Sequence, residues 1–414
     1  MNKNPLIVDK NTAAGALLKK RERREFRFRA YGILGIVFAF GFLAILLFNL
    51  VSSGYTAFLE TRILLPITIS PQAAGADDYF KPVQEALKKH FPEAKERAEI
   101  ILMYALVSRD AEIRLKKMAE ANPSIIGKPM EIWLKASSEA DMYYKARASA
   151  RLNDNQIKWL AALKKEGRVQ KFFSTGFFTH GDSRAAERSG ILSSLTGSIF
   201  TIICCMLAAF PLGLMTAVYL EEFAAKNRFS EILEVNINNL AAVPSIMFGL
   251  LGLAVYINFF GLPRSSSLVG GLTLALLILP IIVITTRNSL RAVPHSIRDA
   301  AIALGASKMQ ATLHHTIPLA MPGIMTGTIL GVSRAMGETA PLLMIGMVAF
   351  IADVPRNIFS PATALPVQVF LWSNSPEAGF IERASAAIMT LLILLVMINS
   401  LAIALRKKFE VKWT

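Results

Sequence analysis

The sequence predicts an all-α polytopic membrane protein, with six transmembrane helices and a mainly helical domain inserted between the first two. Three observations predict this class. Hydrophobic residues make up 53% of the 414-residue chain, and its mean hydropathy is +0.44. Six long segments carry little or no charge. Basic residues gather at the ends of these segments, and the net charge is +15.

The apolar segments are long enough to cross a membrane. A spanning helix needs about 20 mainly apolar residues, because the hydrocarbon layer is ~30 Å thick and each helical residue adds ~1.5 Å. Five segments meet this length without a charge, and a sixth meets it despite two charged residues. In chain order the six segments are 31–51, 191–220, 240–263, 265–286, 317–352 and 384–405.

Basic residues beside the predicted helices set the orientation, because cytoplasmic flanks are enriched in Lys and Arg. The N-terminal segment 1–30 contains Lys19, Lys20, Arg21, Arg23, Arg24, Arg27 and Arg29. The loop after the fourth helix contains Arg287, Arg291, Arg298 and Lys308. The tail 406–414 contains Arg406, Lys407, Lys408 and Lys412. We therefore expect both termini in the cytoplasm, and we assign the net charge to topology rather than to nucleic-acid binding.

The segment 52–189, between the first two helices, is expected to form a periplasmic domain that is mainly helical. Apolar residues recur at helical spacing between 98 and 106, and Asn122 with the proline after it would stop that helix. Asn153 is expected to cap a second helix. A small core between the helices would contain Trp133, Tyr143 and Tyr144. No catalytic motif occurs here, so a spacer or docking role is favoured.

Motifs for enzymatic chemistry are absent from the sequence. Gly127 and Lys128 are followed by proline, so they do not form a phosphate-binding Gly-Lys-Ser/Thr loop. There is no His-Glu-x-x-His motif, and the neighbours His314 and His315 would point about 100° apart on a helix. The adjacent pair Cys204-Cys205 is interpreted as packing residues, because neighbours in one helix do not readily form a disulfide. We therefore expect no metal, cofactor or nucleotide site.

The segment 294–315 is expected to form a short cytoplasmic helix that contacts another protein. Pro294 precedes the helix, and the negative charge of Asp299 in its first turn complements the helix dipole. Gly305 allows a bend or a close helix approach. A smooth face of small side chains would be formed by Ala300, Ala301, Ala303 and Leu304. An ordinary amphipathic loop helix is the alternative interpretation.

Arg334 and Glu338 are the only charged residues of the predicted fifth helix, 317–352. Their i, i+4 spacing would bring them within reach of each other on one helix face. Ionisable residues at membrane depth are costly, and they usually face a substrate path or pair with one another. We expect a paired resting state in which Arg334 is available to an anion. A structural salt bridge that fixes the helix geometry is the alternative.

Several segments resemble a known family. Asp299-Ala300-Ala301, Gly305 and Ile317-Pro318 resemble the coupling-helix motif of ABC importer permeases, Glu-Ala-Ala-x₃-Gly-x₉-Ile-x-Leu-Pro. Asp replaces Glu, His315 replaces Ile, and Ile317 replaces Leu. Signature segments of the PstA family, the A-type permeases of phosphate importers, are similar to Ser333–Leu343, Glu234–Ser245 and Phe178–Arg184. The resemblance covers roughly residues 172–408, and the insert resembles an extension found in some proteobacterial members.

The resemblance implies one transmembrane half of an inner-membrane phosphate importer, with its ABC permease domain at 190–405. The partners would be a second permease of PstC type, two PstB-type ATPase subunits and a periplasmic phosphate-binding protein. The partner ATPase would hydrolyse ATP, so no catalytic residue is expected here. Arg334 and Glu338 are expected in the substrate path. Contact with the ATPase is expected from Asp299, Ala300, Ala301 and Gly305.

Other functions remain possible on the sequence alone. A permease for another oxyanion, sulfate or molybdate, would have the same architecture. An intramembrane enzyme acting on a lipid phosphate would need a nucleophile or metal near the charged pair, where only Ser333, Met336 and Thr339 lie close in sequence. A purely structural subunit would not require a charged pair. Phosphate is favoured over sulfate because a protonated phosphate oxygen can donate a hydrogen bond to Glu338.

Overall fold

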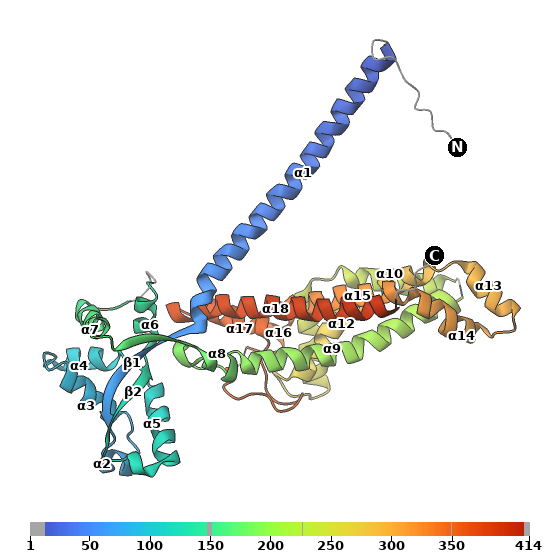
Figure 1. Ribbon diagram of the computed structural model, residues 1–414. Helices are drawn as coiled ribbons and strands as arrows, with labels where there is room; N and C mark the ends of the chain where they lie inside the picture. Colours follow the sequence, from blue (N-terminus) through green and yellow to red (C-terminus); the bar gives the residue numbers. More distant parts are fainter. Residues whose placement is uncertain (1–12, 147–150, 226, 349, 410–414) are drawn as a thin grey trace. The chain divides into compact units, whose positions relative to one another are not determined.

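The computed structural model describes residues 13–146, 151–225, 227–348 and 350–409. It divides into two compact units, Met1–Ser53 and Gly54–Thr414. The described part of the first unit belongs to α1 (Ala13–Gly54), a candidate membrane span. Helices predominate throughout the described chain, which confirms the predicted fold class (Figure 1). Both predicted cytoplasmic ends lie partly outside the described residues, including Lys412 in the tail.

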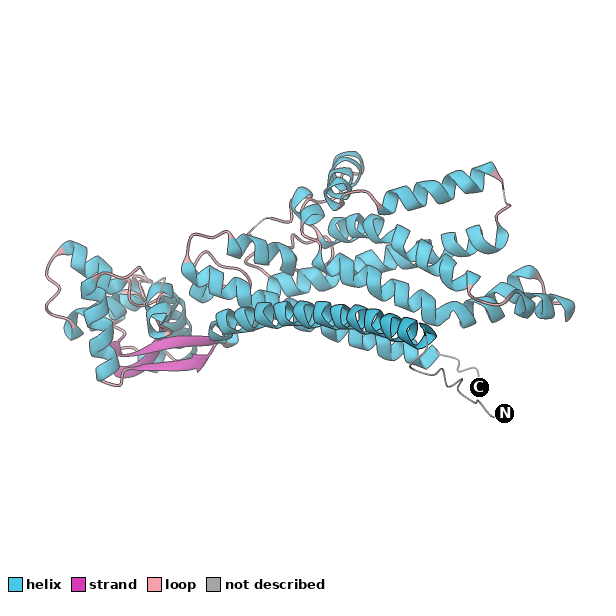
Figure 2. Cartoon of the chain, turned by 90° about the horizontal axis from the view of Figure 1, so that it is seen from above, coloured by secondary structure: helices cyan, strands magenta, loops and turns pink. Residues whose placement is uncertain are grey.

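The insert, defined here as residues 55–190, contains a three-stranded sheet that the sequence analysis did not predict (Figure 2). The central strand β1 (Leu59–Thr68) pairs antiparallel with β2 (Pro129–Lys135) on one side and with β3 (Val169–Phe173) on the other. Ile63, Leu65 and Ile67 alternate along β1 and are fully buried. This period of two is the sequence signal for a strand with one buried face, and helical periodicity does not detect it.

Helices pack against this sheet and form one apolar core with it. They are α2 (Pro71–Gly75), α3 (Lys81–His90), α4 (Arg97–Tyr104), α5 (Asp110–Ala121), α6 (Ser138–Tyr144) and α7 (Asp154–Lys165). The helix predicted from residue 98 onwards is two helices, α4 and α5, and the second stops at Asn122 as expected. Asn153 caps α7 through a capping box with Gln156. The insert is therefore mainly helical, as predicted, around a small sheet.

Four long helices of the second unit form a bundle, in which they run side by side (Figure 1). The central helix α12 (Ser267–Arg291) packs against α9 (Leu192–Val218) and α15 (Ile317–Gly337), and α15 packs against α18 (Ala378–Phe409). Cys204 and Cys205 of α9 are buried and form no disulfide. A Cβ added to Gly271 would lie 2.4 Å from the Cβ of Cys204, so small residues permit this close crossing.

Two predicted spans differ from continuous helices. The described residues contain five helices that are long and apolar enough to cross a membrane, and up to six if one bent pair counts as a span. That pair is α10 (Arg228–Ala241) and α11 (Ser245–Gly252) with the π-helical turn that extends it to Phe259, and it bends by 103°. Pro244 lies at the bend, where its ring restricts the preceding residue to non-helical backbone.

The predicted fifth span, 317–352, is also interrupted. It consists of α15, a break at Glu338 and the short helix α16 (Ala340–Met344). Pro341 explains the break, because it has no N–H to donate to the carbonyl of Gly337 and its ring clashes with that carbonyl in a continuous helix. The chain then turns at Gly346, whose φ is +90°.

The two ends of the bundle differ in what they carry. We call the end with Arg287, Arg291 and Arg298 the basic end; it also carries α13 (His295–Ala303) and α14 (Lys308–Ala311). We call the opposite end, where the insert attaches, the insert end. It carries α8 (Thr175–Thr179) and α17 (Leu365–Ser373).

Candidate functional site

Arg334 and Glu338 form an ion pair at the break after α15. Nε of Arg334 lies 3.5 Å from Oε1 of Glu338. The sequence analysis expected both residues on one helix face, but α15 ends at Gly337. Glu338 has extended backbone, with φ −79° and ψ 124°. The pair therefore spans a helix terminus, where the Arg334 guanidinium also offsets the partial negative charge of the last carbonyl groups.

The Arg334 side chain is turned away from the core of this chain. It is 42% exposed, whereas that of Glu338 is 19% exposed. Leu330, one turn earlier on α15, is 59% exposed. At ~1.5 Å per residue, Arg334 lies about 25 Å along α15 from Ile317, and so toward the insert end rather than at mid-helix. The guanidinium can thus meet a group that this chain does not itself supply.

Contacts with α12 and α18 hold α15 in place. A Cβ added to Gly327 would lie 1.9 Å from Oγ1 of Thr285, and one added to Gly323 would lie 2.3 Å from Oγ of Ser289. The hydroxyl of Ser333 lies 2.9 Å from Oδ1 of Asn399 on α18. The sequence analysis did not identify this glycine stripe, although its four-residue spacing is the signal for close helix packing.

At the basic end, α13 ends in a Schellman motif centred on Gly305. Its φ of +91° is left-handed, a conformation that glycine adopts without strain. The N–H of Gly305 donates to the carbonyl of Ile302 at 2.9 Å, and that of Ala306 donates to the carbonyl of Ala301 at 3.1 Å. The chain turns here and α14 starts behind a capping box made by Ser307 and Gln310.

The residues predicted to contact a partner along α13 differ in exposure. Asp299 and Ala300 are exposed, and Gly305 lies at the exposed turn. Ala301 is 7% exposed, because it packs against the chain itself. Leu304, which the sequence analysis placed on the small-residue face, is 90% exposed and is the most exposed large apolar side chain of the described residues. The surface available to a partner is therefore centred on Ala300 and Leu304 rather than on Ala301.

Arg298 fixes α13 to the ends of two bundle helices. One of its Nη atoms lies 2.7 Å from Oε1 of Glu222, which follows α9, and the two side chains are 12% and 6% exposed. The same nitrogen donates to the carbonyl of Leu290 in the last turn of α12 at 2.8 Å. A buried pair with a further hydrogen bond is geometrically specific. Arg298 therefore connects α13 to the ends of both helices.

Arg287 and Arg291 complete a charge network beside this contact. Glu221 accepts from Arg287 at 3.3 Å and from Arg291 at 2.9 Å. Glu234 of α10 accepts from Arg287 at 3.0 Å. The sequence analysis used these arginines as topology signals and did not assign their partners. The available signal was the acidic pair directly after the second predicted helix, at the same membrane side as the arginines.

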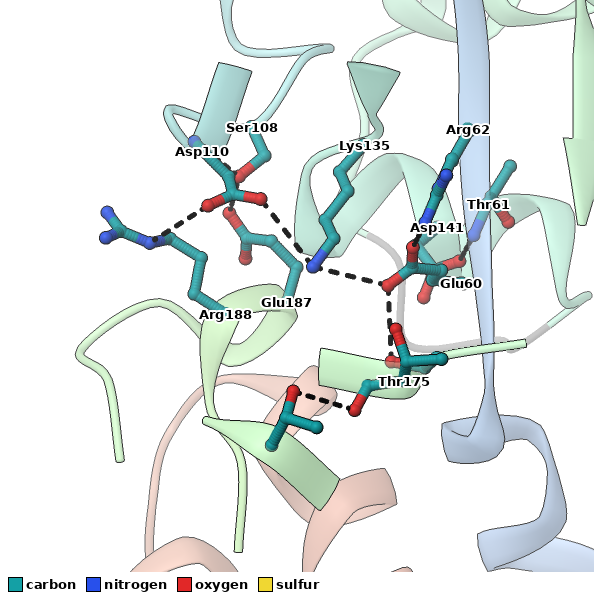
Figure 3. A network of polar contacts seen from close by, with 12 residues as sticks. Glu60, Thr61, Arg62, Ser108, Asp110, Lys135, Asp141, Thr175, Glu187 and Arg188 are labelled. Carbon is teal, nitrogen blue, oxygen red and sulfur yellow. Dashed lines mark hydrogen bonds and ion pairs between the residues drawn. The ribbon is translucent and has the colours of Figure 1, made fainter. Parts of the chain in front are cut away.

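A polar network lies within the insert and links its sheet to the segment that leads into the bundle (Figure 3). Glu60, at the start of β1, contacts Lys135 at 3.3 Å and the hydroxyl of Ser174 at 3.2 Å. Lys135 also lies 3.6 Å from Asp110, which in turn lies 3.8 Å from Arg188. Burial opposes the charged form of Glu60, but Lys135 and Arg62 outweigh this and hold the pKa of Glu60 below its ordinary value.

A second set of contacts ties the insert directly to α18. Nζ of Lys145, which follows α6, lies 2.6 Å from Asp141 and 3.3 Å from Glu382. The Lys145 side chain is only 2% exposed. Arg383, the next residue of α18, donates to the carbonyl of Ser189 at 2.5 Å. The insert is thus fastened to the first turns of α18, and nothing in the sequence pattern predicted these partners.

Two family models match the chain. Residues 209–410 match the model described as binding-protein-dependent transport system inner membrane component. Residues 15–154 match a domain of unknown function, DUF3333. The first match contains α12, α13, α15 and α18, and therefore both the Arg334–Glu338 pair and the contacts at the basic end.

Relatives with similar sequences include phosphate transport system permease proteins named PstA. The protein from Haemophilus influenzae is 34% identical over 223 residues, which cover 53% of this chain and 78% of the relative. PstA 1 from Mycobacterium tuberculosis is 35% identical over 237 residues, which cover 56% and 76%. A solved structure of the inward-facing MetNI methionine ABC transporter is 15% identical, with a TM-score of 0.43, and covers 54% of this chain and 95% of that one.

Proposed function

We propose a function from one premise: this chain belongs to the family of phosphate transport system permease proteins PstA. It is a multi-pass inner-membrane permease subunit of an ATP-driven phosphate importer. As a transport subunit it works with ATPase subunits, a substrate-binding protein and a second permease. We assign these partners to the PstB, phosphate-binding and PstC types, and we assign ATP hydrolysis to the PstB-type subunits.

The basic end faces the cytoplasm in this proposal, and the insert lies in the periplasm. The clusters of Lys and Arg beside the spans support this orientation. We retain the boundaries 1–30 for the N-terminal segment, 31–51 for the first span, 52–189 for the predicted periplasmic segment, 190–405 for the permease domain and 406–414 for the tail. Of these, the N-terminal and C-terminal assignments extend beyond the described residues.

Arg334 receives phosphate in the substrate path. Its guanidinium is the exposed member of the ion pair, and we assign its exposed side to the contact with the second permease. A planar guanidinium can donate to two phosphate oxygens at once. In the resting state Glu338 neutralises Arg334, so the charge is not left alone at membrane depth.

Glu338 helps to distinguish phosphate from sulfate. When phosphate binds Arg334, Glu338 can accept a hydrogen bond from a protonated phosphate oxygen, which ionised sulfate cannot donate. The break at Glu338 supports this role, because a residue outside the helix can move away from Arg334 without unwinding α15. A helix-bracing salt bridge would not need one partner outside the helix.

The ATPase docks on α13 at the basic end. The exposed side chains of Ala300 and Leu304, with Asp299 and Gly305 beside them, offer an apolar surface with one negative charge. Movement of the ATPase pair is transmitted through Arg298 to Glu222 and to the last turn of α12. The resulting movement of α9 and α12 switches the substrate path between its inward-facing and outward-facing states.

An Arg334→Lys variant tests whether Arg334 binds phosphate in the substrate path. Lysine keeps the charge and the pair with Glu338 but loses the planar donor fork, so we expect assembly to persist while phosphate uptake falls about tenfold or more, which corresponds to one charge-assisted hydrogen bond. Arg264→Lys is the matched control, because Arg264 is an exposed loop arginine. Unchanged uptake by Arg334→Lys, at equal membrane abundance, would reduce the pair to a structural brace.

A further inference from the structure

An exposed cluster of aromatic rings lies at the insert end. We call it the aromatic patch and define it by Tyr55, Phe58, Phe173 and Phe178. Phe58 and Phe178 stack with their centroids 5.7 Å apart and planes at 3°, and Phe173 stacks on Phe178 at 6.2 Å and 12°. Tyr55, Phe173 and Phe178 are 54%, 58% and 38% exposed. Exposure of this much apolar ring surface to water is unfavourable, so we expect another molecule to cover the patch.

Phe177 fixes the aromatic patch to α18. Its ring is fully buried and packs edge-on against Phe58 at 5.5 Å and against Phe178 at 5.1 Å. Phe177 belongs to one buried cluster with Phe380 and Ala384 of α18. The guanidinium of Arg383 lies 5.8 Å from the centre of the Phe177 ring. The patch therefore has a fixed height along α18.

That height is where the uncharged part of α18 begins. Glu382 and Arg383 are followed by a segment without charge from Ala384 to Leu405. Gly54, the last residue before Tyr55, lies against α18 at the same level, since a Cβ added to it would be 3.0 Å from the amide nitrogen of Ala386. In a membrane protein this level is the boundary between headgroups and acyl chains, where aromatic side chains concentrate.

We propose that the aromatic patch is an interfacial anchor, which inserts into the outer leaflet of the phospholipid bilayer and holds the insert on the membrane surface. The four rings lie at the boundary between the headgroups and the acyl chains. Lys171 lies two residues before Phe173 in β3, hence on the same face of the strand, and it is exposed. Its ammonium group can reach a lipid phosphate while its apolar stem follows the patch.

Continuity with the lipid-facing surface of the bundle selects lipid as the occupant. Ile381 on α18 is 53% exposed and Ile199 on α9 is 41% exposed, at the same end of the bundle. Large apolar side chains are thus exposed on both the helices and the insert at this end. The inference rests on the membrane location in the proposed function, and it is independent of phosphate as the substrate.

Spin labels measure whether the patch is in the bilayer. The full chain carries Cys204→Ala and Cys205→Ala, with Phe173→Cys or Phe178→Cys labelled, in nanodiscs of phosphatidylethanolamine and phosphatidylglycerol. The readout is the ratio of collision rates with oxygen, which concentrates in lipid, and with a nickel chelate, which stays in water. Ile101→Cys is the control on the insert, where the native side chain is 59% exposed, and Leu207→Cys is the control on α9, at 71%.

We expect ratios at 173 and 178 severalfold above that at Ile101 and approaching that at Leu207. Ratios equal to the Ile101 value, with Leu207 in lipid, would overturn the anchor and leave the membrane assignment of the bundle intact. Protection of 173 and 178 from both reagents would also overturn it, because protein would then cover the patch. A water-exposed Leu207 would instead contradict the membrane location on which the proposed function depends.

Discussion

In the proposed function, single residues at the basic end determine how α13 contacts the ATPase. Leu304 is 90% exposed and makes no packing contribution that its replacement would remove, whereas Ala301 is buried within the chain. The sequence analysis identified the small-residue face but weighted Ala300 and Ala301 equally. It could not separate them, because helical spacing gives the angle between two side chains and not the side on which the rest of the chain packs.

Leu304→Asp should weaken docking of the ATPase. A charge would replace an apolar side chain at the centre of the exposed surface, while the fold of this chain loses no contact. We expect the ATPase to co-purify with the variant less than with the wild type, at unchanged membrane abundance, and uptake to fall in parallel. Met309→Asp is the control, because Met309 is also exposed, at 54%, but belongs to α14. Equal co-purification by Leu304→Asp and the wild type would remove α13 from the docking surface.

Substitutions at Gly305 should separate backbone strain from surface chemistry. With φ at +91°, Asn is tolerated better than Leu, because short polar side chains adopt left-handed backbone at lower cost. A Cβ at this position would meet no neighbouring atom, so space is not limiting. We expect Gly305→Asn to retain coupled ATP hydrolysis and Gly305→Leu to uncouple it, as measured by ATPase activity and uptake of the assembled complex. Identical behaviour of the two variants would show that backbone conformation here is not important.

At the scale of elements, the close crossing of α12 and α15 makes Gly327 sensitive to a single methyl group. Gly327→Ala would bring a Cβ to 1.9 Å from Thr285 Oγ1 and 2.4 Å from its Cβ, so a helix must shift. Overpacking of this kind costs about 1–3 kcal/mol. Gly331→Ala is the matched control on the same helix, since its nearest atom would be 3.6 Å away. We expect a lower Tm for Gly327→Ala only; equal Tm values would contradict the described crossing.

The spans were predictable because about 20 apolar residues are needed to cross hydrocarbon, whatever the neighbouring sequence. Their interruptions were less predictable. The bend at Pro244 and the break before Pro341 lie inside apolar segments, where hydropathy is uniform and only the proline gives a signal. Arg334 and Glu338 were recognised as a pair from their charges and their i, i+4 spacing, but the helix end between them depends on Pro341. The sheet of the insert was not predicted, because β1 directly follows a span. The alternation of apolar residues along β1 has the period of two that is typical of a strand, and helical periodicity does not detect it.

At the scale of the whole molecule, the stability of the insert should depend on pH through Glu60. Its folded pKa is depressed, so the stability that its ion pairs contribute is present above the unfolded pKa of about 4.3 and is lost as pH falls through the folded value. We expect Glu60→Gln to lower the Tm at pH 7, and the difference from wild type to vanish at acidic pH. Fluorescence of Trp133 and Trp159 in the insert gives the readout. A difference that persists unchanged below the folded pKa would contradict this role.

The orientation of the chain in the membrane is tested by replacing Lys95 with cysteine and adding a thiol reagent that does not cross the membrane. Lys95 is exposed on the insert, whereas Lys145 is buried in its ion pairs and is unsuitable. We expect Lys95→Cys to be labelled in spheroplasts without permeabilisation, because the insert is periplasmic in the proposed topology. Asn227→Cys, between α9 and α10 at the basic end, is the opposite control and should need permeabilisation. If Lys95→Cys were protected in intact spheroplasts, the insert would not be periplasmic and the proposed six-span topology would be wrong.

Uptake of labelled phosphate in cells that lack this chain tests the central claim most directly, with sulfate uptake measured in parallel. The account predicts that phosphate uptake at low external concentration is lost, that the wild-type chain restores it, that Arg334→Lys restores it only weakly at equal membrane abundance, and that sulfate uptake is unaffected in every strain. Normal phosphate uptake without the chain, or a loss of sulfate uptake instead, would contradict the assignment of this permease to phosphate import.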